Sequence, residues 1–317
     1  MPTRVLVIGG TRFFGKLLVR GLLEQGCEVA MATRGRAADD FGDAVRRIRV
    51  DRRNADAMRA AFDGARYDIV YDQLCYSPLD AAISAEVFVG KVGHYVMSST
   101  IEVYRGLPVP TGRPFTETGV ALDRVDVDHA YPWHAPELSE VSYGRGKRQA
   151  EAFLQQDGRL PFTSVRIAHV LSGPDDFTGR LRDYVERALQ GRPLWHTATP
   201  GASSFTSPAG IVAFLLWAGT APLRGPVNAA DDGALTSVDI YRRVCALAGV
   251  PEQLRPVRSE LTPSELSPFD YPAPHLIDTA RARAAGHRFG NTSDWLDGFI
   301  VQHIEALRAQ AATSPTA

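Results

Sequence analysis

The first predicted strand of this chain leads directly into a glycine turn and a helix. The run Val5–Ile8 is entirely apolar, and Gly9 and Gly10 follow it. A short apolar run ended by glycines is typical of a strand that is covered on both faces in a parallel sheet. Apolar residues then recur at helical spacing from Phe14 to Leu23. The start of the chain therefore predicts a strand followed by a crossover helix.

The same alternation of strand and helix continues to residue 167. Alternating elements of this length predict right-handed crossovers and an α/β fold with a doubly wound parallel sheet. The predicted strands are Val5–Ile8, Glu28–Ala32, Arg46–Val50, Ile69–Tyr71, Tyr95–Met97 and Phe162–Ile167, and the predicted helices between them span 55–63, 79–90 and 142–156.

The second half of the chain is less regular. Glycine, proline and short helical patterns predominate, and helices are predicted at 177–190, 208–218, 237–248 and 293–308. We expect residues 1–170 to form the dinucleotide-binding domain, 171–309 a smaller substrate lobe and 310–317 a frayed tail. Segments near 206–230 are candidates to return to the sheet.

Composition and charge favour a small-molecule substrate. The 317 residues include 35 Lys and Arg against 36 Asp and Glu, so no net field indicates a nucleic acid or membrane partner. The three cysteines lack any ligand spacing, and we expect neither disulfides nor a metal site. The N-terminus runs straight into a strand, and no apolar stretch approaches the roughly 18 residues of a membrane helix, so we expect the cytoplasm.

The glycine turn after the first strand predicts a phosphate-binding loop. Glycines there let backbone N–H groups and the N-terminus of the following helix approach a pyrophosphate. A glycine-rich loop is a weak signal alone, but its position between an apolar strand and a helix favours a dinucleotide. The residues expected to contact the cofactor here are Gly9, Thr11, Arg12, Phe13, Phe14 and Gly15.

The end of the second strand bears on the choice between NAD and NADP. An NAD-binding protein usually offers Asp or Glu to the ribose hydroxyls there, but this chain offers Arg34 and Arg36. Guanidinium groups suit a 2′-phosphate, so we lean toward NADP, with solvated arginines beside NAD as the alternative. Asp51, after the third strand, is placed to contact the adenine or to form a turn.

Tyr143 and Lys147 form a YxxxK unit within a predicted helix. At this spacing the two side chains lie one turn apart on one face. A free phenol has a pKa of about 10, and a neighbouring ammonium favours the phenolate. The pair therefore predicts proton exchange with a substrate hydroxyl or carbonyl, against the alternative of a surface helix pair.

Together these motifs resemble the extended short-chain dehydrogenase/reductase superfamily, in its NAD-dependent epimerase/dehydratase branch. The matching residues are the loop 9–15, Asp51, the strand end Ser98–Thr100, and Tyr143 with Lys147. The resemblance implies a Rossmann-like doubly wound sheet with a smaller mixed α/β C-terminal lobe. It also implies a homodimer that pairs through helices 79–90 and 142–156.

The resemblance also implies catalytic roles. Tyr143 is similar to the family's acid/base, and Lys147 to the group that lowers its pKa and holds the nicotinamide ribose. Thr100 corresponds to the hydroxyl that hydrogen-bonds the reacting oxygen, with Ser98 and Ser99 as alternatives. Ser98, Tyr143 and Lys147 are thereby also expected to contact the cofactor.

Glu102 distinguishes between reactions within that branch. Thr100-Ile101-Glu102-Val103-Tyr104 resembles the strand end of sugar-nucleotide 4,6-dehydratases, whose glutamate removes the proton beside a transient ketone. Elimination or epimerisation needs such a second base, whereas simple ketone reduction does not. We expect a dehydratase or epimerase acting on a sugar-like or nucleoside-like substrate. A solvent-facing Glu102, or one paired with Arg105, is the alternative.

Further side chains are expected to bind the substrate, and two other functions stay open. The expected substrate contacts are Tyr76, Ser99, His134 and Arg180; a structural histidine and a solvated arginine are the alternatives for the last two. An NADPH-dependent ketoreductase is the alternative reaction. A dinucleotide sensor without catalysis, or an RNA-associated protein, is the alternative of another class.

Overall fold

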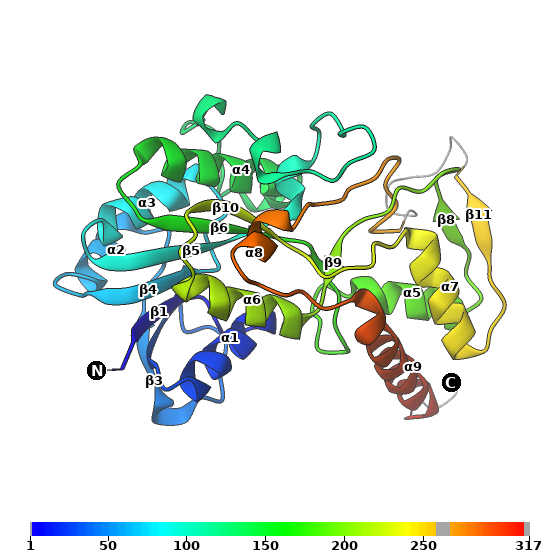
Figure 1. The fold of residues 1–317 in the computed structure, drawn as a ribbon. Coiled ribbons are helices and arrows are strands. Elements are labelled where there is room, and N and C mark those ends of the chain that lie inside the picture. The colour runs from blue at the N-terminus through cyan, green and yellow to red at the C-terminus, as the bar shows by residue number, and fades with distance from the viewer. Residues whose placement is uncertain (1, 258–266, 314–317) are drawn as a thin grey trace.

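The computed structural model describes residues 2–257 and 267–313, and its centre is a seven-stranded parallel sheet (Figure 1). The strand order is β10-β6-β5-β4-β1-β2-β3, and every pair of neighbours is parallel. This is a Rossmann-like α/β fold, as the sequence predicted. The strands are β1 (Arg4–Ile8), β2 (Glu28–Thr33), β3 (Val45–Arg49), β4 (Tyr67–Asp72), β5 (Val92–Thr100), β6 (Phe162–Ile167) and β10 (Gly225–Ala229).

Helices cover both faces of the sheet because successive strand residues point to opposite sides. Val5 and Val7 of β1 pack in one core with α1 (Phe13–Glu24) and α6 (Pro208–Thr220). Leu6 and Ile8 pack in a second core on the other face. That face carries α2 (Ala55–Ala61), α3 (Pro78–Phe88) and α4 (Ser139–Asp157).

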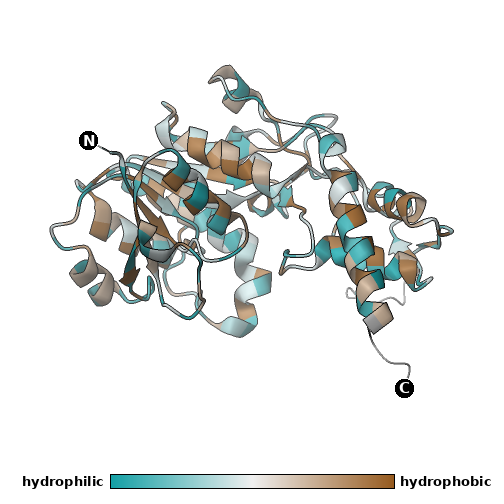
Figure 2. Cartoon of the chain, turned by 90° about the horizontal axis from the view of Figure 1, so that it is seen from below, coloured by the Kyte–Doolittle hydropathy of each residue, from teal (hydrophilic) through white to brown (hydrophobic). Residues whose placement is uncertain are grey.

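The second lobe has a hydrophobic core of its own, built from three amphipathic helices. These are α5 (Arg180–Leu189), α7 (Ser237–Ala248) and α9 (Leu296–Thr313). Hydrophobic and hydrophilic residues alternate along α9, as expected of a helix with one buried face (Figure 2). Two small parallel pairs complete the lobe: β7 (His169–Val170) with β9 (Phe205–Thr206), and β8 (Leu194–His196) with β11 (Leu254–Pro256).

Residues 206–230, which we expected as candidates to return to the sheet, contribute α6 and β10 to the first lobe. Helix α9 continues to Thr313, beyond the expected start of the tail at 310, and residues 314–317 lie outside the described part of the chain. The remaining short helices are α8 (Ala280–Ala284) and the 3-10 turns η1 (Gly42–Ala44), η2 (Ile101–Tyr104), η3 (Glu117–Gly119), η4 (Leu122–Arg124), η5 (Pro136–Leu138) and η7 (Thr292–Asp294).

The apolar residues of α3 and α4 are mostly used within one chain. Ala81, Ala150 and Leu154 are fully buried in the core between these helices and the sheet, and Ala85 is fully buried as well. Their apolar character is therefore explained by core packing, and the homodimer stays a prediction. Within residues 2–257 and 267–313, no helix is long and apolar enough to cross a membrane.

Candidate active site

A cleft opens where the carboxyl ends of the central strands meet the second lobe. Its volume is about 1610 Å³, which exceeds the roughly 300–1,000 Å³ of a common small-ligand pocket. The cleft therefore has room for a cofactor and a substrate together. Both lobes contribute to its wall, including Phe13, Thr100 and Tyr143 from the first and Phe177 and Arg180 from the second.

The turn between β1 and α1 has the backbone that a phosphate loop requires. Gly9 and Gly10 have φ angles of 104° and 91°, which side chains rarely allow. A Cβ atom on Gly15 would collide with the side chain of Gln73, so this glycine lets α1 approach the segment after β4. No side chain caps the N-terminus of α1 at Arg12. The first N–H groups of the helix are thus suited to an anion.

Phe13 adopts a conformation that is unusual for a bulky residue. Its φ angle is 50°, in the left-handed region, and such strain costs about 1–3 kcal/mol and is concentrated at functional sites. The Phe13 ring centroid lies 5.4 Å from that of Phe14 and 5.8 Å from that of Phe177 in the second lobe. The phosphate loop therefore contacts the opposite wall of the cleft.

The two residues expected near the adenosine end of a cofactor are exposed. Arg34 follows β2 and projects into solvent. The Asp51 carboxylate accepts a hydrogen bond from the Arg53 backbone N–H at 3.0 Å, which is the turn-forming contact considered as its alternative role. The contacts of Arg34 and Asp51 with a cofactor stay predictions.

Two glycines let α4 approach the ends of β4 and β5 closely. A Cβ atom on Gly144 would lie 2.5 Å from the Glu102 carbonyl oxygen, and one on Gly146 would collide with the Tyr76 carbonyl oxygen. Real Cβ atoms essentially never come so close. These glycines therefore fix where Tyr143 and Lys147 stand relative to the strand ends.

Lys147 is buried and its ammonium contacts two groups of the first lobe. Its Nζ donates a hydrogen bond to the Ser98 carbonyl oxygen at 2.6 Å and lies 4.3 Å from the centre of the Tyr76 ring. Burial lowers the pKa of Lys147 to about 8, although the charges of Cys75, Asp72 and Asp80 oppose that change. Protonated and neutral forms of the lysine thus exchange slightly above neutral pH.

Tyr143 faces Tyr76 and Thr100 from α4. The two tyrosine ring centroids are 6.1 Å apart, so Tyr76 contacts both Lys147 and Tyr143. Tyr143 is 37% exposed at the mouth of the cleft, yet the surrounding protein still raises the pKa of its phenol through burial. Hydrogen bonding with Thr100 and the charge of Arg180 lower this pKa by less. The sequence-based expectation that Lys147 depresses this pKa is therefore not met by the described residues alone, because the lysine is directed at Ser98 and Tyr76.

A buried network of charges holds the segment that carries Tyr76. The Tyr76 N–H donates to Asp80 at 2.9 Å, and Asp80 pairs with the buried Arg52 guanidinium at 2.8 Å. Arg52 also donates to Asp72 at 2.5 Å, at the end of β4. The Arg52 guanidinium thus neutralises both buried carboxylates, and the resulting ion pairs hold the loop between β4 and α3 in place.

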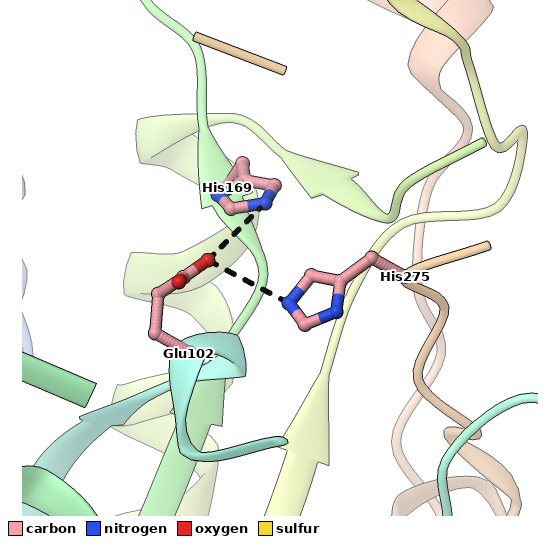
Figure 3. Close-up of side chains that lie close together, drawn as sticks. All are labelled: Glu102, His169 and His275. Carbon is pink, nitrogen blue, oxygen red and sulfur yellow. Dashed lines mark ion pairs between the residues drawn. The ribbon is translucent and has the colours of Figure 1, made fainter. Parts of the chain in front are cut away.

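Glu102 lies at the centre of a polar cluster on the second-lobe side of the cleft (Figure 3). Its Oε1 atom is 3.6 Å from His275 Nε2 and 3.8 Å from His169 Nε2. Tyr271 donates its hydroxyl to the same oxygen at 3.2 Å and lies 2.9 Å from His169 Nε2. Three distant segments, η2, β7 and the loop before α8, therefore meet at one carboxylate.

The cluster has defined protonation states. Burial opposes ionisation of Glu102, but interactions with His275, His169 and Arg105 outweigh it and hold the Glu102 pKa at about 2. Burial lowers the pKa of His169 to about 3, against the attraction of Glu102. Burial and then Glu102 raise the pKa of the Tyr271 phenol. At neutral pH the cluster thus contains a carboxylate, a neutral imidazole at His169 and a neutral phenol.

Comparison with known proteins agrees with these features. Residues 5–88, which include β1, the phosphate loop and α3, match the model of the NAD dependent epimerase/dehydratase family. This segment belongs to that family. The family resemblance drawn from the sequence is confirmed.

Two curated relatives share lower identity over a longer segment. A chloroplast stem-loop binding protein of 41 kDa from Arabidopsis thaliana is 24% identical over 60% of this chain and 48% of its own length. A 2′-dehydrokanamycin reductase from Streptomyces kanamyceticus is 29% identical over 60% of this chain and 50% of its own length. The matches thus span about half the length of these relatives.

Solved structures of epimerases and dehydratases share the fold over nearly the whole chain. A UDP-glucose 4-epimerase from Thermus thermophilus, solved with NAD, has a TM-score of 0.70 at 22% identity and covers 95% of this chain and 98% of its own. A dTDP-glucose 4,6-dehydratase from Bacillus anthracis, solved with NAD, has a TM-score of 0.71 at 13% identity, with 96% and 97% covered. At these identities the likeness establishes the fold.

The structure separates the expected substrate contacts into two groups. Tyr76 and Arg180 line the cleft, as does Thr100 beside Tyr143. His134 instead pairs with buried Asp80 at 3.2 Å and is absent from the cleft wall, because its loop folds over the N-terminus of α3. His134 was expected to bind substrate, with a structural role as the alternative, and the structure places it in the structural role.

Ser99 lines the cleft, but its hydroxyl is engaged with a buried residue. It is 4% exposed, and its hydroxyl donates to Glu151 at 2.5 Å. Glu151 is itself paired with the fully buried Arg166 of β6 at 2.6 Å. The Ser99 hydroxyl thus completes a buried ion pair beneath the cleft, and of the strand-end hydroxyls considered for the reacting oxygen, Thr100 is the one next to Tyr143.

His169, His275 and Tyr271 were missed by the sequence analysis. They lie 67, 173 and 169 residues after Glu102, so no local spacing connects them with it. The one available signal was position: His169 follows β6, and strands of a parallel sheet end at a common edge.

Proposed function

We propose that the chain is an NAD(P)-dependent enzyme that transiently oxidises a hydroxyl of a sugar-like or nucleoside-like substrate and then epimerises or dehydrates it. The observation that carries this proposal is the grouping of Thr100, Tyr143 and Lys147 in one cleft with a second, ionised acid, Glu102. The first three residues suit proton exchange at an alcohol, and the fourth is a separate base.

The cofactor would occupy the side of the cleft that begins at the phosphate loop. The N-terminus of α1 favours a pyrophosphate, and the conformations of Gly9 and Gly10 allow close approach. Arg34 is positioned after β2, where a 2′-phosphate would lie, and this favours NADP over NAD. When bound, NAD(P)+ supplies the hydride acceptor.

Tyr143 and Thr100 would manage the proton of the reacting hydroxyl. Tyr143 in its phenolate form would accept the O–H proton while the carbon gave up its hydride, and this would leave a ketone. Thr100 hydrogen-bonds the oxygen that changes charge. Lys147 would hold the ribose hydroxyls with the donor hydrogens that the Ser98 carbonyl does not use.

Glu102 would act on the ketone. Because its pKa is about 2, it is ionised throughout the neutral range but is a weak base. It can remove a C–H proton only when a neighbouring carbonyl has made that proton acidic, which is the condition that transient oxidation provides. Return of the proton to the other face would lead to an epimer, and loss of a β-hydroxyl as water, with the proton that Glu102 removed, would lead to a dehydrated product. In both cases hydride would then return to the substrate, so that the NAD(P)+ form is regenerated.

Two alternatives have supporting observations. An NADPH-dependent ketoreductase is favoured by the relative named 2′-dehydrokanamycin reductase and by Arg34. A non-catalytic dinucleotide-binding protein, with or without RNA, is favoured by the relative named as a stem-loop binding protein. Cytoplasmic location and a homodimer belong to the same proposal as expectations.

The decisive measurement is the cofactor stoichiometry. Purified protein would first be analysed by mass spectrometry for bound NAD or NADP. It would then be incubated with UDP-glucose and dTDP-glucose in deuterated water, with catalytic or stoichiometric cofactor. Turnover with catalytic cofactor and deuterium beside the oxidised carbon supports the proposal. One NADPH consumed per product indicates the ketoreductase, and bound cofactor without hydride exchange on any probe indicates the sensor.

Glu102→Gln tests the second base. It should abolish deuterium incorporation and leave hydride exchange measurable, since oxidation uses Tyr143 rather than Glu102. Arg105→Gln is the matched control, because Arg105 is exposed and lies 3.5 Å from the Oε2 atom of Glu102. Undiminished deuterium incorporation in Glu102→Gln would exclude Glu102 as the base.

A further inference from the structure

The polar cluster around Glu102 contains three atoms that ligate metals in other proteins. Glu102 Oε1, His169 Nε2 and His275 Nε2 all lie within 4.8 Å of one another (Figure 3). Both histidine side chains point their Nε2 atoms at the same carboxylate oxygen. Convergence of three ligand atoms on one point is the first requirement of a metal site.

The separations fit a bridging cation better than direct hydrogen bonds. Oε1 lies 3.6 Å and 3.8 Å from the two imidazole nitrogens, beyond the roughly 2.7–3.2 Å of an N–H···O bond. Ligands about 2.1 Å from a tetrahedral Zn²⁺ lie about 3.4 Å apart. A cation between the three atoms would thus require only small side-chain movements.

His275 adds an independent observation. The residue is 6% exposed, and its buried Nε2 atom makes no hydrogen bond among the described residues, because Glu102 Oε1 at 3.6 Å is close enough to interact electrostatically but too distant for a hydrogen bond. A buried polar atom that lacks a partner destabilises the folded state, and such atoms in folded proteins call for an explanation. This nitrogen is directed at the centre of the cluster, where a cation would use its lone pair.

We propose that Glu102, His169 and His275 bind a first-row divalent transition metal ion, with Zn²⁺ the foremost candidate. Two imidazoles and one carboxylate form the ligand set of several catalytic zinc sites and of non-haem iron sites, both of which keep an open position. Magnesium and calcium prefer all-oxygen ligand sets, so the two nitrogens disfavour them.

Tyr271 occupies the neighbouring position. Its hydroxyl is 3.2 Å from Glu102 Oε1 and 2.9 Å from His169 Nε2. With a cation bound, the hydroxyl either becomes a fourth ligand or moves aside and leaves a water. The Tyr271 side chain lines the same cleft as Tyr143, so the open position of the metal faces the substrate space.

Binding of the ion stands independently of the proposed function, whereas a catalytic role for it rests on that function. Through its open coordination position, the cation would polarise the ketone oxygen of an oxidised substrate and acidify the neighbouring C–H bond. Coordination through Oε1 leaves Oε2 of Glu102 to accept the proton. The two roles of the carboxylate are therefore compatible.

The absence of cysteine–histidine spacing led us to expect no metal site from the sequence. That expectation considered ligands that are close in the chain. The present ligands come from η2, β7 and the loop before α8, and only the fold brings them together.

Zinc binding can be measured without substrate or cofactor. Untagged full-length protein, stripped with a chelator, would be titrated with ZnSO4 against a chromophoric chelator, and its metal content measured by mass spectrometry. We expect one Zn²⁺ per chain, and Co²⁺ in its place should give visible absorption bands of a low-coordinate site. His275→Ala and His169→Gln should each weaken Zn²⁺ binding by at least about 100-fold, since loss of even an outer-shell partner costs about 10–100-fold.

His134→Ala is the matched control, because His134 is partly exposed and pairs with Asp80 outside the cluster. It should bind Zn²⁺ like the wild type. Circular dichroism of each variant establishes that it is folded, and two separate histidine variants guard against failure of one to fold. Folded wild-type protein that takes up no stoichiometric zinc, or wild-type affinity in both cluster variants, would overturn the proposal. Zinc binding without any turnover would support the metal site and contradict the proposed enzymatic function.

Discussion

The burial of Lys147 predicts an unusual alkaline gain in stability. Burial lowers its pKa from the ordinary 10.5 to about 8, so between these values the unfolded chain binds more protons than the folded chain. The free energy of unfolding therefore rises with pH across this window. Below about pH 8 the buried ammonium of Lys147 lowers the free energy of unfolding by its full amount. This destabilisation disappears as the lysine loses its proton.

The magnitude follows from the same pKa change. Linkage gives about 3 kcal/mol in total, of which about 2 kcal/mol would appear between about pH 7 and about pH 9.5. Because Lys147 is only 2% exposed, solvent screening reduces this little.

Urea unfolding of the wild type and Lys147→Met, measured at several pH values, isolates this contribution. Burial raises the pKa values of Cys75 and Tyr95, so these groups also bind protons differently in the folded and unfolded chains at alkaline pH. They are common to both proteins, and their contribution cancels in the difference. The wild type should gain about 2 kcal/mol relative to Lys147→Met over this range. Lys91→Met controls for removal of a lysine elsewhere. Parallel pH profiles of wild type and Lys147→Met would refute the assignment of the buried charge.

Three further predictions concern the active site. Tyr143→Phe should lower hydride exchange by about 10²–10⁴-fold while cofactor affinity, followed by fluorescence, changes little. Gly144→Ala places a Cβ atom 2.5 Å from the Glu102 carbonyl oxygen and should lower both activity and melting temperature, whereas Gly298→Ala in α9 meets no atom and should stabilise by about 0.5–1 kcal/mol. Arg34→Glu should shift the ratio of NADP to NAD affinity, measured by calorimetry, at least about tenfold toward NAD.

The first lobe could be predicted from sequence because each of its elements carries its own pattern. The apolar run before Gly9 predicted β1, and β2 to β6 were placed within a few residues of their observed positions. The last strand of the sheet, β10, was not predicted as a strand and lies in the segment expected only as a candidate to return to the sheet. Strand ends were the weaker part: β5 extends from Val92 to Thr100, longer than the predicted Tyr95–Met97, because His94 and Ser98 are polar yet buried in the sheet.

Only the first-lobe wall of the cleft could be predicted, because only its residues lie in local sequence motifs. Thr100, Glu102, Tyr143 and Lys147 lie in short motifs whose spacing has chemical meaning. The opposite wall comes from irregular segments whose proximity depends on how the second lobe closes over the sheet. His275, for example, is held by one backbone hydrogen bond to Ala202 and one from Ser204, a pairing that no local pattern indicates.

The positive charge near the Tyr143 phenol comes from a different residue than the sequence predicted. The sequence assigned that charge to Lys147, one helical turn away, but its ammonium is directed at the Ser98 carbonyl and the Tyr76 ring. The charge that lowers the Tyr143 pKa is that of Arg180, at the start of α5 in the second lobe. Since burial still raises this pKa overall, a reactive phenolate depends on both lobes and on further positive charge in the cleft. We therefore expect Tyr143 to form a phenolate only when the second lobe is packed against the sheet and the cleft holds its cofactor and substrate.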